Sequence, residues 1–413
     1  MIRQSIAPRS DEPRVRSRPD RNYRLYRKLV LNNFAKLKHG LIHYKDDQGS
    51  QTFGTPGSEF EVEVTVNENR FFSTVVFQGS LGAAESYIQG DWDCSDLTQL
   101  FRIFIKNQSQ MNEIERAMAG LSRLKDKLVN RFTRNTVQGS KRNIVAHYDL
   151  SNAFYKLWLD PTMTYSSGIF PTPQSSMEDA SLEKLSSMCR LVDLQPEDHV
   201  LEIGTGWGSL SMYAAKTFGC RITTTTISDE QYKLAVERIE EAGLEGQITV
   251  IQEDYRKLTG QYDKIISIEM IEAVGHEFIP TYVEALDRLL KPGGKVAIQG
   301  ITINDQIYDS YRKSVDFIKK YIFPGGNLLS VSYFMDTVGK HSSLRPIHLS
   351  EIGLHYATTL QHWRASFNAV LPEVRALGFS EAFIRLWNYY LTYCEAGFLE
   401  KHIGDVQMGF EKR

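Results

Sequence analysis

A short apolar strand that runs into three glycines narrows the folds open to this chain. The segment "HVLEIGTGWGSLSMYAAK" (199–216) has the pattern of a buried strand, a tight turn and a helix. Gly204, Gly206 and Gly208 would let the backbone approach a ligand at the carboxyl end of the strand. Four more strand-like runs follow, namely 221–228, 248–255, 262–270 and 293–303. Helical segments separate them, at 209–218, 229–243 and 279–294. This alternation predicts an α/β fold with a doubly wound parallel sheet.

The glycine spacing also indicates the kind of cofactor. The pattern is G-x-G-x-G, unlike the dinucleotide fingerprint, and no P-loop lysine follows it. Glu202 stands two residues before the first glycine, where a carboxylate would attract an ammonium group and repel a pyrophosphate. Asp254 could accept a hydrogen bond from an adenine amine, and Tyr255 offers an apolar face. The second strand ends in hydroxyl groups instead of an acid, so Thr226 and Gln231 are left to bind the ribose. We therefore predict S-adenosylmethionine, with an ordinary glycine turn as the alternative.

The part before residue 140 has a different character. The chain has 413 residues, enough for two domains. Residues 1–24 form a basic tail, which is either a disordered solvated segment or a contact for an anionic membrane or nucleic acid. We predict a small α+β module at 25–110, with a β-hairpin at 59–78 and a helix from about Leu97 to Ile105. In residues 111–139, apolar residues recur every three or four positions with basic residues between them, which predicts a helical connector. This helix either docks between domains or faces a membrane with its basic side.

Cysteine usage and hydropathy restrict the class of protein further. The four cysteines have no C-x-x-C spacing, which argues against a metal cluster and a disulfide framework. No apolar region follows the N-terminal arginines, and no stretch of about 18 apolar residues occurs. We expect a cytoplasmic protein that touches the inner face of a membrane peripherally.

Several segments resemble the cyclopropane fatty acyl phospholipid synthases, the related mycolic acid cyclopropane synthases and the fatty acid methyltransferases. The resemblance runs from "GSLGAAESYIQGDWDC" (79–94) to "NYYLTYCEAGF" (388–398). Its most specific segments, in chain order, are 146–170, "VLEIGTGWG", "TISDEQ", "EDYR", "EMIEAVG", "KYIFPGG" and "HYATTLQHW". It implies a class I S-adenosylmethionine methyltransferase fold, a Rossmann-like doubly wound sheet, over residues 140–413, with acyl-binding insertions and a small N-terminal α+β domain.

The resemblance also assigns roles to cofactor-binding residues. It implies that Tyr165 and Ser166 contact the methionine carboxylate and that the glycines after Glu202 cradle the cofactor. Thr226 and Gln231 would hold the ribose. The residues placed near the adenine are Asp254, Tyr255 and Arg256.

The family transfers the methyl carbon to the double bond of an unsaturated acyl chain, and closing the ring then needs a base. The resemblance implies a bound bicarbonate as that base, held by Glu272 and Tyr356, with Ile301 keeping its place in the motif. Ser167 stands where the family pattern has a cysteine, and Gln299 where it has a histidine. Glutamine cannot carry a positive charge, so these departures predict an altered anion site.

Three further residues receive roles from the resemblance. Cys394 matches a cysteine proposed as catalytic, but the chemistry needs no protein nucleophile, and we predict a packing residue near the acyl site. His147 and Tyr148 either order a lid over the site or belong to the core.

Two products and two other functions stay open at this point. Ring closure is the leading prediction, and methylation that leaves a methyl or methylene branch is the alternative. A small-molecule N-methyltransferase and a non-enzymatic lipid or cofactor sensor are more distant. The predicted partners are an unsaturated phospholipid or fatty acyl substrate, an anionic membrane and, as an open alternative to a monomer, a second copy of the chain. No nucleic acid partner and no metal are expected.

Overall fold

The computed structural model describes residues 22–109, 135–136, 139 and 150–413. Residues 1–21 of the predicted tail, most of the predicted connector, and His147 and Tyr148 lie outside the described residues. The chain divides into two compact units. The first contains the described residues up to Ser109 together with Ser314–Ile322 and Leu371–His402, and the second contains the other described residues. Segments from late in the sequence thus pack with the N-terminal module, while the predicted boundaries at 110 and 140 stay predictions.

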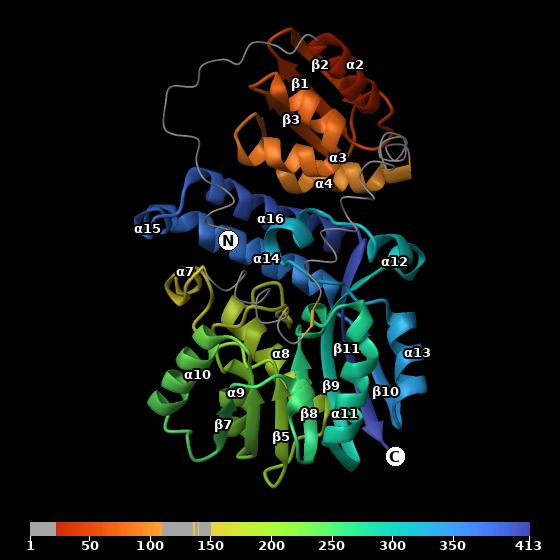
Figure 1. Ribbon diagram of the computed structural model, residues 1–413. Coiled ribbons are helices and arrows are strands. Elements are labelled where there is room, and N and C mark those ends of the chain that lie inside the picture. Colours follow the sequence, from red (N-terminus) through yellow and green to blue (C-terminus); the bar gives the residue numbers. More distant parts are fainter. Residues whose placement is uncertain (1–21, 110–134, 137–138, 140–149) are drawn as a thin grey trace. The chain divides into compact units, whose positions relative to one another are not determined.

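The first unit is built on a four-stranded sheet of order β2-β1-β3-β4 (Figure 1). β1 pairs in parallel with β3 and antiparallel with β2, and β4 pairs antiparallel with β3. The strands are β1 (Leu41–Asp46), β2 (Gly49–Gly54), β3 (Glu61–Val66) and β4 (Trp92–Cys94). The helices of this unit are α2 (Tyr23–Phe34), α3 (Arg70–Ile88), α4 (Leu97–Lys106), α15 (Leu371–Ala376), α16 (Glu381–Leu399) and the π-helical turn η4 (Ile318–Ile322).

The predicted hairpin at 59–78 is wrong in its second half. The first run forms β3, but residues 70–78 begin helix α3. A run this short fits both helical and strand periodicity, so tertiary packing decides. Here Phe71 and Phe72 are buried within the unit, and β3 finds its neighbours in β1 and β4 instead. The predicted helix near 97–105 is confirmed as α4, which Asp96 caps by accepting a hydrogen bond from the Gln99 amide.

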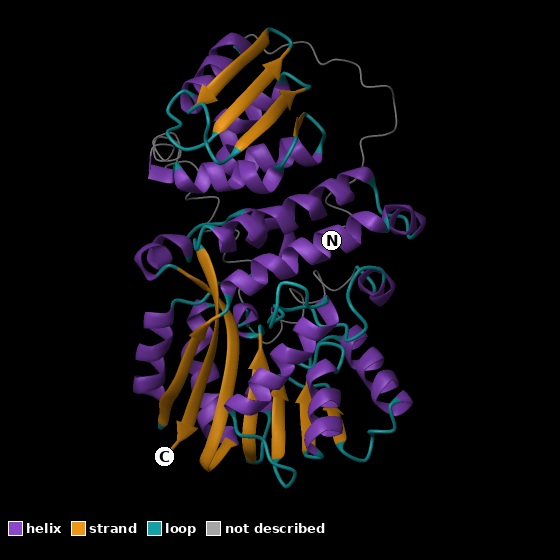
Figure 2. Cartoon of the chain, turned by 180° about the vertical axis from the view of Figure 1, so that it is seen from behind, coloured by secondary structure: helices purple, strands orange, loops and turns teal. Residues whose placement is uncertain are grey.

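The second unit holds a seven-stranded sheet of order β10-β11-β9-β8-β5-β6-β7, whose strands lie side by side in Figure 2. Five strands are parallel, which confirms the predicted sheet, while β10 and β11 extend it in antiparallel fashion beyond β9. The strands are β5 (His199–Ile203), β6 (Arg221–Thr225), β7 (Ile248–Ile251), β8 (Tyr262–Ile268), β9 (Leu290–Ile303), β10 (Leu344–Glu351) and β11 (Ile403–Lys412).

Helices connect these strands and complete the unit. The helices of eight or more residues are α8 (Met177–Leu191), α9 (Ser209–Phe218), α10 (Asp229–Glu241), α11 (Ile279–Leu289), α13 (Val331–His341) and α14 (Gly353–Ala369). The shorter ones are α7 (Asn152–Lys156), α12 (Asp305–Tyr311) and the 3-10 turns η1 (Tyr255–Lys257), η2 (Ile271–Ala273) and η3 (His276–Phe278).

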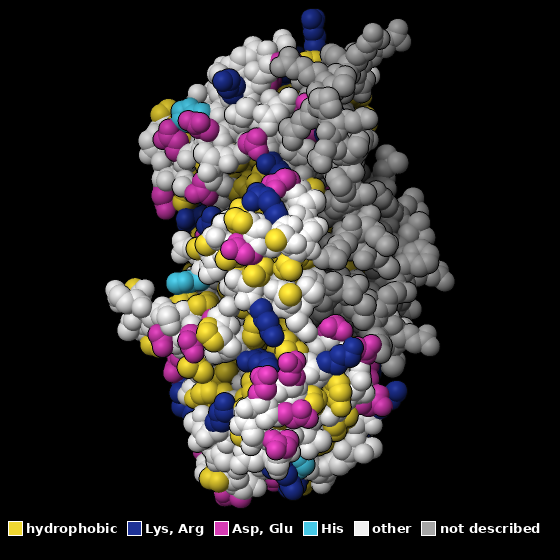
Figure 3. Space-filling view, turned by 90° about the vertical axis from the view of Figure 1, so that its left-hand side faces the viewer, with side chains coloured by type: hydrophobic (Ala, Val, Ile, Leu, Met, Phe, Trp, Pro, Cys, Tyr) yellow, Lys and Arg dark blue, Asp and Glu magenta, His cyan; other side chains and the backbone are white. Residues whose placement is uncertain are grey.

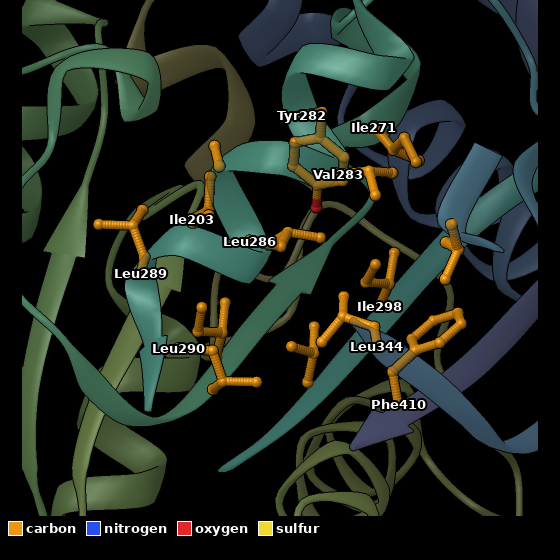
Figure 4. Packing of buried hydrophobic residues seen from close by; sticks show 14 of the residues in the cluster. Ile203, Ile271, Tyr282, Val283, Leu286, Leu289, Leu290, Ile298, Leu344 and Phe410 are labelled. Carbon is orange, nitrogen blue, oxygen red and sulfur yellow. The ribbon is translucent and has the colours of Figure 1, made fainter. Parts of the chain in front are cut away.

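Both faces of this sheet are covered by apolar side chains. Consecutive residues Ile265 and Ile266 are fully buried, and they belong to different hydrophobic clusters. One cluster packs the sheet against α11 and α13, and Figure 4 shows side chains of α11 and the sheet pointing towards one another. The other packs it against α8, α9 and α10. Strands buried on both faces leave only the strand ends for a ligand site.

Candidate active site

The glycine turn after β5 lies beside the end of β6. The amides of Gly204 and Thr205 both donate to the Thr225 carbonyl oxygen, at 3.1 Å each. Gly204, Gly206 and Gly208 all have positive φ angles, of 105°, 53° and 85°. A Cβ atom at Gly206 would meet no atom within 4 Å, so this side of the turn is open space. The turn therefore fits the predicted cradle for a cofactor.

The residues predicted to hold the ribose lie together after β6. The Thr226 hydroxyl donates to Oε1 of Gln231 at 2.9 Å, and both residues are buried. Ser228 caps α10 by accepting from the Gln231 amide, which fixes the backbone of Gln231. Because Oε1 is engaged by Thr226, the Nε2 end of the amide is the end that can donate to a sugar hydroxyl.

The residues predicted near the adenine form an ion pair beside an aromatic ring. The guanidinium of Arg256 binds both carboxylate oxygens of Asp254, from Nε at 2.8 Å and from Nη2 at 2.5 Å. This fork fixes the carboxylate of Asp254. Oδ1 also accepts from the Arg256 backbone amide at 3.0 Å, so Oδ2 is the oxygen with a lone pair left for a further donor. Tyr255 is buried and packs edge-on against Tyr282, with ring centroids 5.5 Å apart. In this structure Arg256 thus holds the carboxylate of Asp254 in place.

A buried lysine lies behind the predicted methionine carboxylate site. Nζ of Lys184, on α8, donates to Oγ of Ser166 at 2.6 Å, and Lys184 is 1% exposed. Burial lowers the pKa of Lys184 to about 8, although Glu269 and other carboxylates oppose this shift. The neighbouring ring of Tyr165 packs against Trp363, with centroids 5.1 Å apart. Lys184 was not predicted, but a lysine between Ala180 and Met188 on the apolar face of a helix is a signal that sequence reasoning could have used.

Glu202 faces a hydroxyl group inside the unit. The Ser211 hydroxyl, on α9, donates to its Oε2, and the carboxylate is buried. Burial raises the pKa of Glu202 to about 7, against the hydrogen bonds from Ser211 and Thr224. The predicted ammonium-binding carboxylate is therefore close to half-protonated at neutral pH.

Three predicted anion ligands converge on Glu269, at the end of β8. The backbone amide of Ser167 donates to Oε1 of Glu269 at 2.8 Å, and Nε2 of Gln299 donates to the same oxygen at 2.9 Å. The Tyr356 hydroxyl, on α14, donates to Oε2 at 2.7 Å. The structure thus brings together three of the predicted site residues, but around a carboxylate that the sequence analysis had not placed among them.

Gln299 has no amide hydrogen left over in this network. Its second N–H donates to Oδ2 of Asp405, on β11, at 2.9 Å, and its Oε1 accepts from Nε2 of Gln407 at 3.1 Å. Gln299 and Asp405 are fully buried, and Oδ1 of Asp405 has no hydrogen-bond partner among the described residues. Asp405 and Gln407 lie more than 100 residues from Gln299 in sequence, so only the pairing of β9 with β11 could reveal them.

Glu272 lies on the short turn η2 and binds one predicted partner. Its Oε1 accepts from the backbone amide of Ile301 at 2.5 Å, while Oε2 is buried and has no partner among the described residues. Burial, followed by the nearby negative charge of Glu269, raises the pKa of Glu272 to about 8. Glu272 is therefore mostly protonated at neutral pH.

The charges of this cluster can be assigned from these partners. Glu269 receives three donors and the attraction of Lys184, which favour its ionised form, although burial raises its pKa. Asp405 receives one donor, and burial with the charges of Glu269 and Glu272 raises its pKa well above the usual value. We therefore read Glu269 as the carboxylate that bears the negative charge and Asp405 and Glu272 as neutral acids.

Cys394 is a predicted site residue of the other unit. It lies on α16 in the first unit, and burial raises the pKa of its thiol, so the thiolate needed for nucleophilic attack is disfavoured. The packing role near the acyl site stays a prediction.

Comparison with known proteins decides the family. The family model for mycolic acid cyclopropane synthetase matches residues 135–408 of the chain. The chain belongs to this family. The tuberculostearic acid methyltransferase UfaA1 of Mycobacterium tuberculosis is 38% identical, over 80% of this chain and 78% of the relative. The cyclopropane-fatty-acyl-phospholipid synthase of Escherichia coli (strain K12) is 36% identical, over 85% of this chain and 88% of the relative.

Solved structures of mycolic acid cyclopropane synthases share the fold. CmaA1 complexed with SAH and CTAB aligns with a TM-score of 0.62 and 27% identity, covering 66% of this chain and 98% of CmaA1. Coclaurine N-methyltransferase aligns with a TM-score of 0.61 at 18% identity, covering 80% of this chain and 99% of that chain, and shows the fold alone. The protein is thus an S-adenosylmethionine-dependent enzyme of the cyclopropane synthase and fatty acid methyltransferase kind.

Proposed function

We propose that the protein transfers the methyl carbon of S-adenosylmethionine to the double bond of an unsaturated acyl chain, in a phospholipid, and then closes a cyclopropane ring. The observation that carries this proposal is the buried network in which Ser167, Gln299 and Tyr356 all donate to Glu269. It lies at the ends of parallel strands, the edge that also carries the glycine turn 204–208.

The residues around the glycine turn fit the cofactor. S-adenosylmethionine supplies an electrophilic methyl group when it is bound. Thr226 and Gln231 would hold the ribose, Ser166 the methionine carboxylate, and Asp254 the adenine amine. An alkene is a weak nucleophile, so these residues contribute by holding the methyl group still and close to the double bond.

Methylation without ring closure is the second candidate. Gln299 stands where a charged histidine would help to hold an anion, and the amide cannot take a positive charge. UfaA1, a relative at 38% identity, is described as a tuberculostearic acid methyltransferase. In methylation without ring closure, a hydride shift first moves the positive charge to the carbon that bears the new methyl group. Loss of a proton from that methyl group then gives a methylene group, and a later reduction would give a methyl branch.

Bicarbonate fits the described residues poorly. Both N–H groups of Gln299 are already used, by Glu269 and Asp405. The Ser167 hydroxyl donates to the Gly168 carbonyl at 2.9 Å, and the Tyr356 hydroxyl donates to Glu269. A bicarbonate at this place would have to displace Glu269 from all three donors.

We further propose a peripheral contact with an anionic membrane in the cytoplasm. In the part of the chain that the structure describes, no helix is apolar over enough length to span a bilayer. Leu25 and Leu29 of α2 are 55% and 38% exposed, Phe77 of α3 is 60% exposed, and Arg24 and Lys28 are exposed on α2 beside the two leucines. Exposed apolar side chains flanked by cations suit a lipid surface.

Charge elsewhere gives little further support for this contact. On the face shown in Figure 3, acidic and basic side chains of the described residues are mixed, so neither sign dominates there. The membrane proposal thus rests on the α2 patch (Arg24, Leu25, Lys28, Leu29 and Phe77) and on the basic tail. A homodimer remains a prediction from the sequence, which sedimentation of the purified protein tests.

Product analysis tests the proposed function. Purified protein is incubated with isotope-labelled S-adenosylmethionine and vesicles of an unsaturated phosphatidylglycerol, and the acyl chains are analysed by mass spectrometry and proton NMR. Ring protons support the first candidate and methylene protons the second. The absence of label from the lipid contradicts both.

A further inference from the structure

We propose that Glu269 is the base that accepts the proton from the transferred methyl group, so that the chain supplies with its own side chain what the family resemblance assigned to bicarbonate. This inference rests on the proposed function, because a base is needed only if the methyl group is transferred to a double bond. It names a residue for which the sequence analysis gave no role in the chemistry.

The geometry of the donors is the first reason. The three groups that would hold an anion, the Ser167 amide, the Gln299 side chain and the Tyr356 hydroxyl, donate to Glu269 at 2.7–2.9 Å. They bind both oxygens of one carboxylate. A carboxylate has the same planar O–C–O group as bicarbonate, so the side chain can take the place of the free ion.

The supply of donors is the second reason. The amide of Gln299 can donate two hydrogen bonds, and Glu269 and Asp405 receive both. Gln407 in turn donates to Oε1 of Gln299 at 3.1 Å, which fixes which end of the amide faces Glu269. Gln299 therefore has a carboxylate fixed in the protein as its partner, in place of the free anion that the resemblance implies.

The charges around Glu269 are the third reason. The ionisable groups that act on it are Lys184 from α8, Tyr356 from α14, Glu272 from η2 and Asp405 from β11. Lys184 is the cation among them, and it balances one negative charge. A second anion beside Glu269 would be repelled at short range in a buried site. Burial raises the pKa of Glu269, which makes its carboxylate a stronger base than a solvated one.

The backbone of Glu269 is the fourth reason. Its φ angle is 47°, a left-handed conformation that residues other than glycine rarely adopt. The amide of Glu269 donates to the Gln299 carbonyl oxygen at 2.9 Å, which holds this conformation. Backbone strain of this kind is disfavoured for a residue with a side chain and often occurs at functional sites, which agrees with a role for Glu269 in the reaction.

The proposed step balances without another reactant. The π electrons of the double bond attack the methyl carbon, the carbon–sulfur bond breaks, and the acyl chain becomes a carbocation. An oxygen of Glu269 then takes a proton from the transferred methyl group. The electron pair of that C–H bond closes the ring onto the cation, or forms the methylene double bond if a hydride has shifted first. The proton leaves Glu269 to water after the lipid is released.

The experiment compares the wild-type protein with Glu269→Gln and Glu269→Gly in buffer stripped of carbon dioxide, with and without added bicarbonate. Label transfer to unsaturated phospholipid vesicles is measured. Glu277→Gln, at an exposed acid in the same part of the sequence, is the matched control. Affinity for S-adenosylhomocysteine and the melting temperature report whether each variant is folded.

We expect the wild-type rate to be unchanged when bicarbonate is removed. Glu269→Gln should lose about 100- to 10,000-fold in rate, the range of general base catalysis, with cofactor affinity retained. Glycine tolerates the left-handed backbone and vacates the space of the carboxylate, so added bicarbonate should restore part of the activity of Glu269→Gly. Purely structural damage would not respond to bicarbonate.

Two results would overturn the proposal: a wild-type rate that falls without bicarbonate and returns with it, or a folded Glu269→Gln protein with a rate within tenfold of wild type. The first needs no variant, so the proposal stays testable even if both substitutions fail to fold. Failure of the proposed function looks different, because then the wild-type protein transfers no label to lipid under any condition.

Discussion

Replacing Lys184 with methionine separates cofactor recognition from stability. Nζ of Lys184 donates to Oγ of Ser166 at 2.6 Å. Because that oxygen accepts from the lysine, the proton of the Ser166 hydroxyl is free to point elsewhere, and the cofactor carboxylate is the acceptor predicted for it. Lys184→Met removes both this orientation and the positive charge behind it.

The size of the effect follows from the kind of bond that is lost. A hydrogen bond to a charged group contributes about 1.5–3 kcal/mol. At about 1.4 kcal/mol for each tenfold change, affinity for S-adenosylhomocysteine should fall roughly 10- to 150-fold. Affinity for 5′-methylthioadenosine, which lacks the amino acid part, should stay within about twofold, since this ligand has no carboxylate to accept a hydrogen bond from Ser166.

Lys184→Met should not lower the stability of the folded protein, although it weakens cofactor binding. Burial lowers the pKa of Lys184 from its usual 10.5 to about 8. That difference means that keeping the lysine charged in the folded protein costs roughly 3 kcal/mol, which methionine avoids. The unfolded chain binds the extra proton between about pH 8 and 10.5, so wild-type stability should rise relative to the variant in that window. At pH 7 we expect the melting temperature of Lys184→Met to be no lower than that of wild type.

Isothermal titration calorimetry with the two ligands and thermal unfolding are the assays. Lys340→Met, at an exposed lysine on α13 whose side chain is 66% accessible, is the matched control. An equal loss of affinity for both ligands, or no loss for either, would show that Lys184 does not orient Ser166 towards the cofactor carboxylate.

Three further predictions concern other parts of the chain. Glu272→Gln should raise the melting temperature more at pH 8 than at pH 5. Burial raises the pKa of Glu272 from 4.5 to about 8, so the wild-type protein loses stability as the pH rises from 4.5 to about 8, while glutamine does not titrate. Equal shifts in melting temperature at the two pH values would contradict this. Since glutamine mimics the neutral acid, the variant should also keep more activity than Glu269→Gln. Gly204→Ala should weaken S-adenosylhomocysteine binding at least tenfold, because φ is 105° there and the new Cβ would lie 3.2 Å from Met270. Gly219→Ala, with φ of 75° at the end of α9 and open space around it, should cost stability alone, and a similar loss of affinity in both variants would refute a specific role for the turn. Replacing Leu25, Leu29 and Phe77 by serine should reduce sedimentation with anionic vesicles without changing cofactor affinity; unchanged sedimentation would remove the α2 patch from the proposal.

The residues predicted for the cofactor come from local signals in the sequence, and their roles stay predictions. The glycine turn, Thr226 with Gln231, and Asp254 with Tyr255 each follow a strand within a few residues. Parallel strands bring their carboxyl ends to one edge, so the pattern of strands and helices alone places these segments together.

The reaction side could be predicted only in part. Its residues come from segments far apart in the sequence. Asp405 contacts Gln299 because β11 pairs with β9, and no local sequence pattern predicts that pairing. Glu269 and Glu272 stand three residues apart, and the sequence alone favoured Glu272 by motif. The left-handed backbone at Glu269, which directs its carboxylate to the shared donors, is a tertiary property. The same limit explains α3, where packing of Phe71 and Phe72 decided between helix and strand.

One measurement tests most directly the claim that a methyl group is transferred to a lipid double bond and then loses a proton. The protein is incubated with S-adenosylmethionine that has a fully deuterated methyl group and with vesicles of an unsaturated phospholipid. The masses of the acyl chains are then measured by mass spectrometry. We expect lipid that has gained one carbon bearing two of the three deuterium atoms, whether the product is a ring or a methylene group. Lipid that keeps all three deuterium atoms, or lipid that gains no carbon, would contradict it.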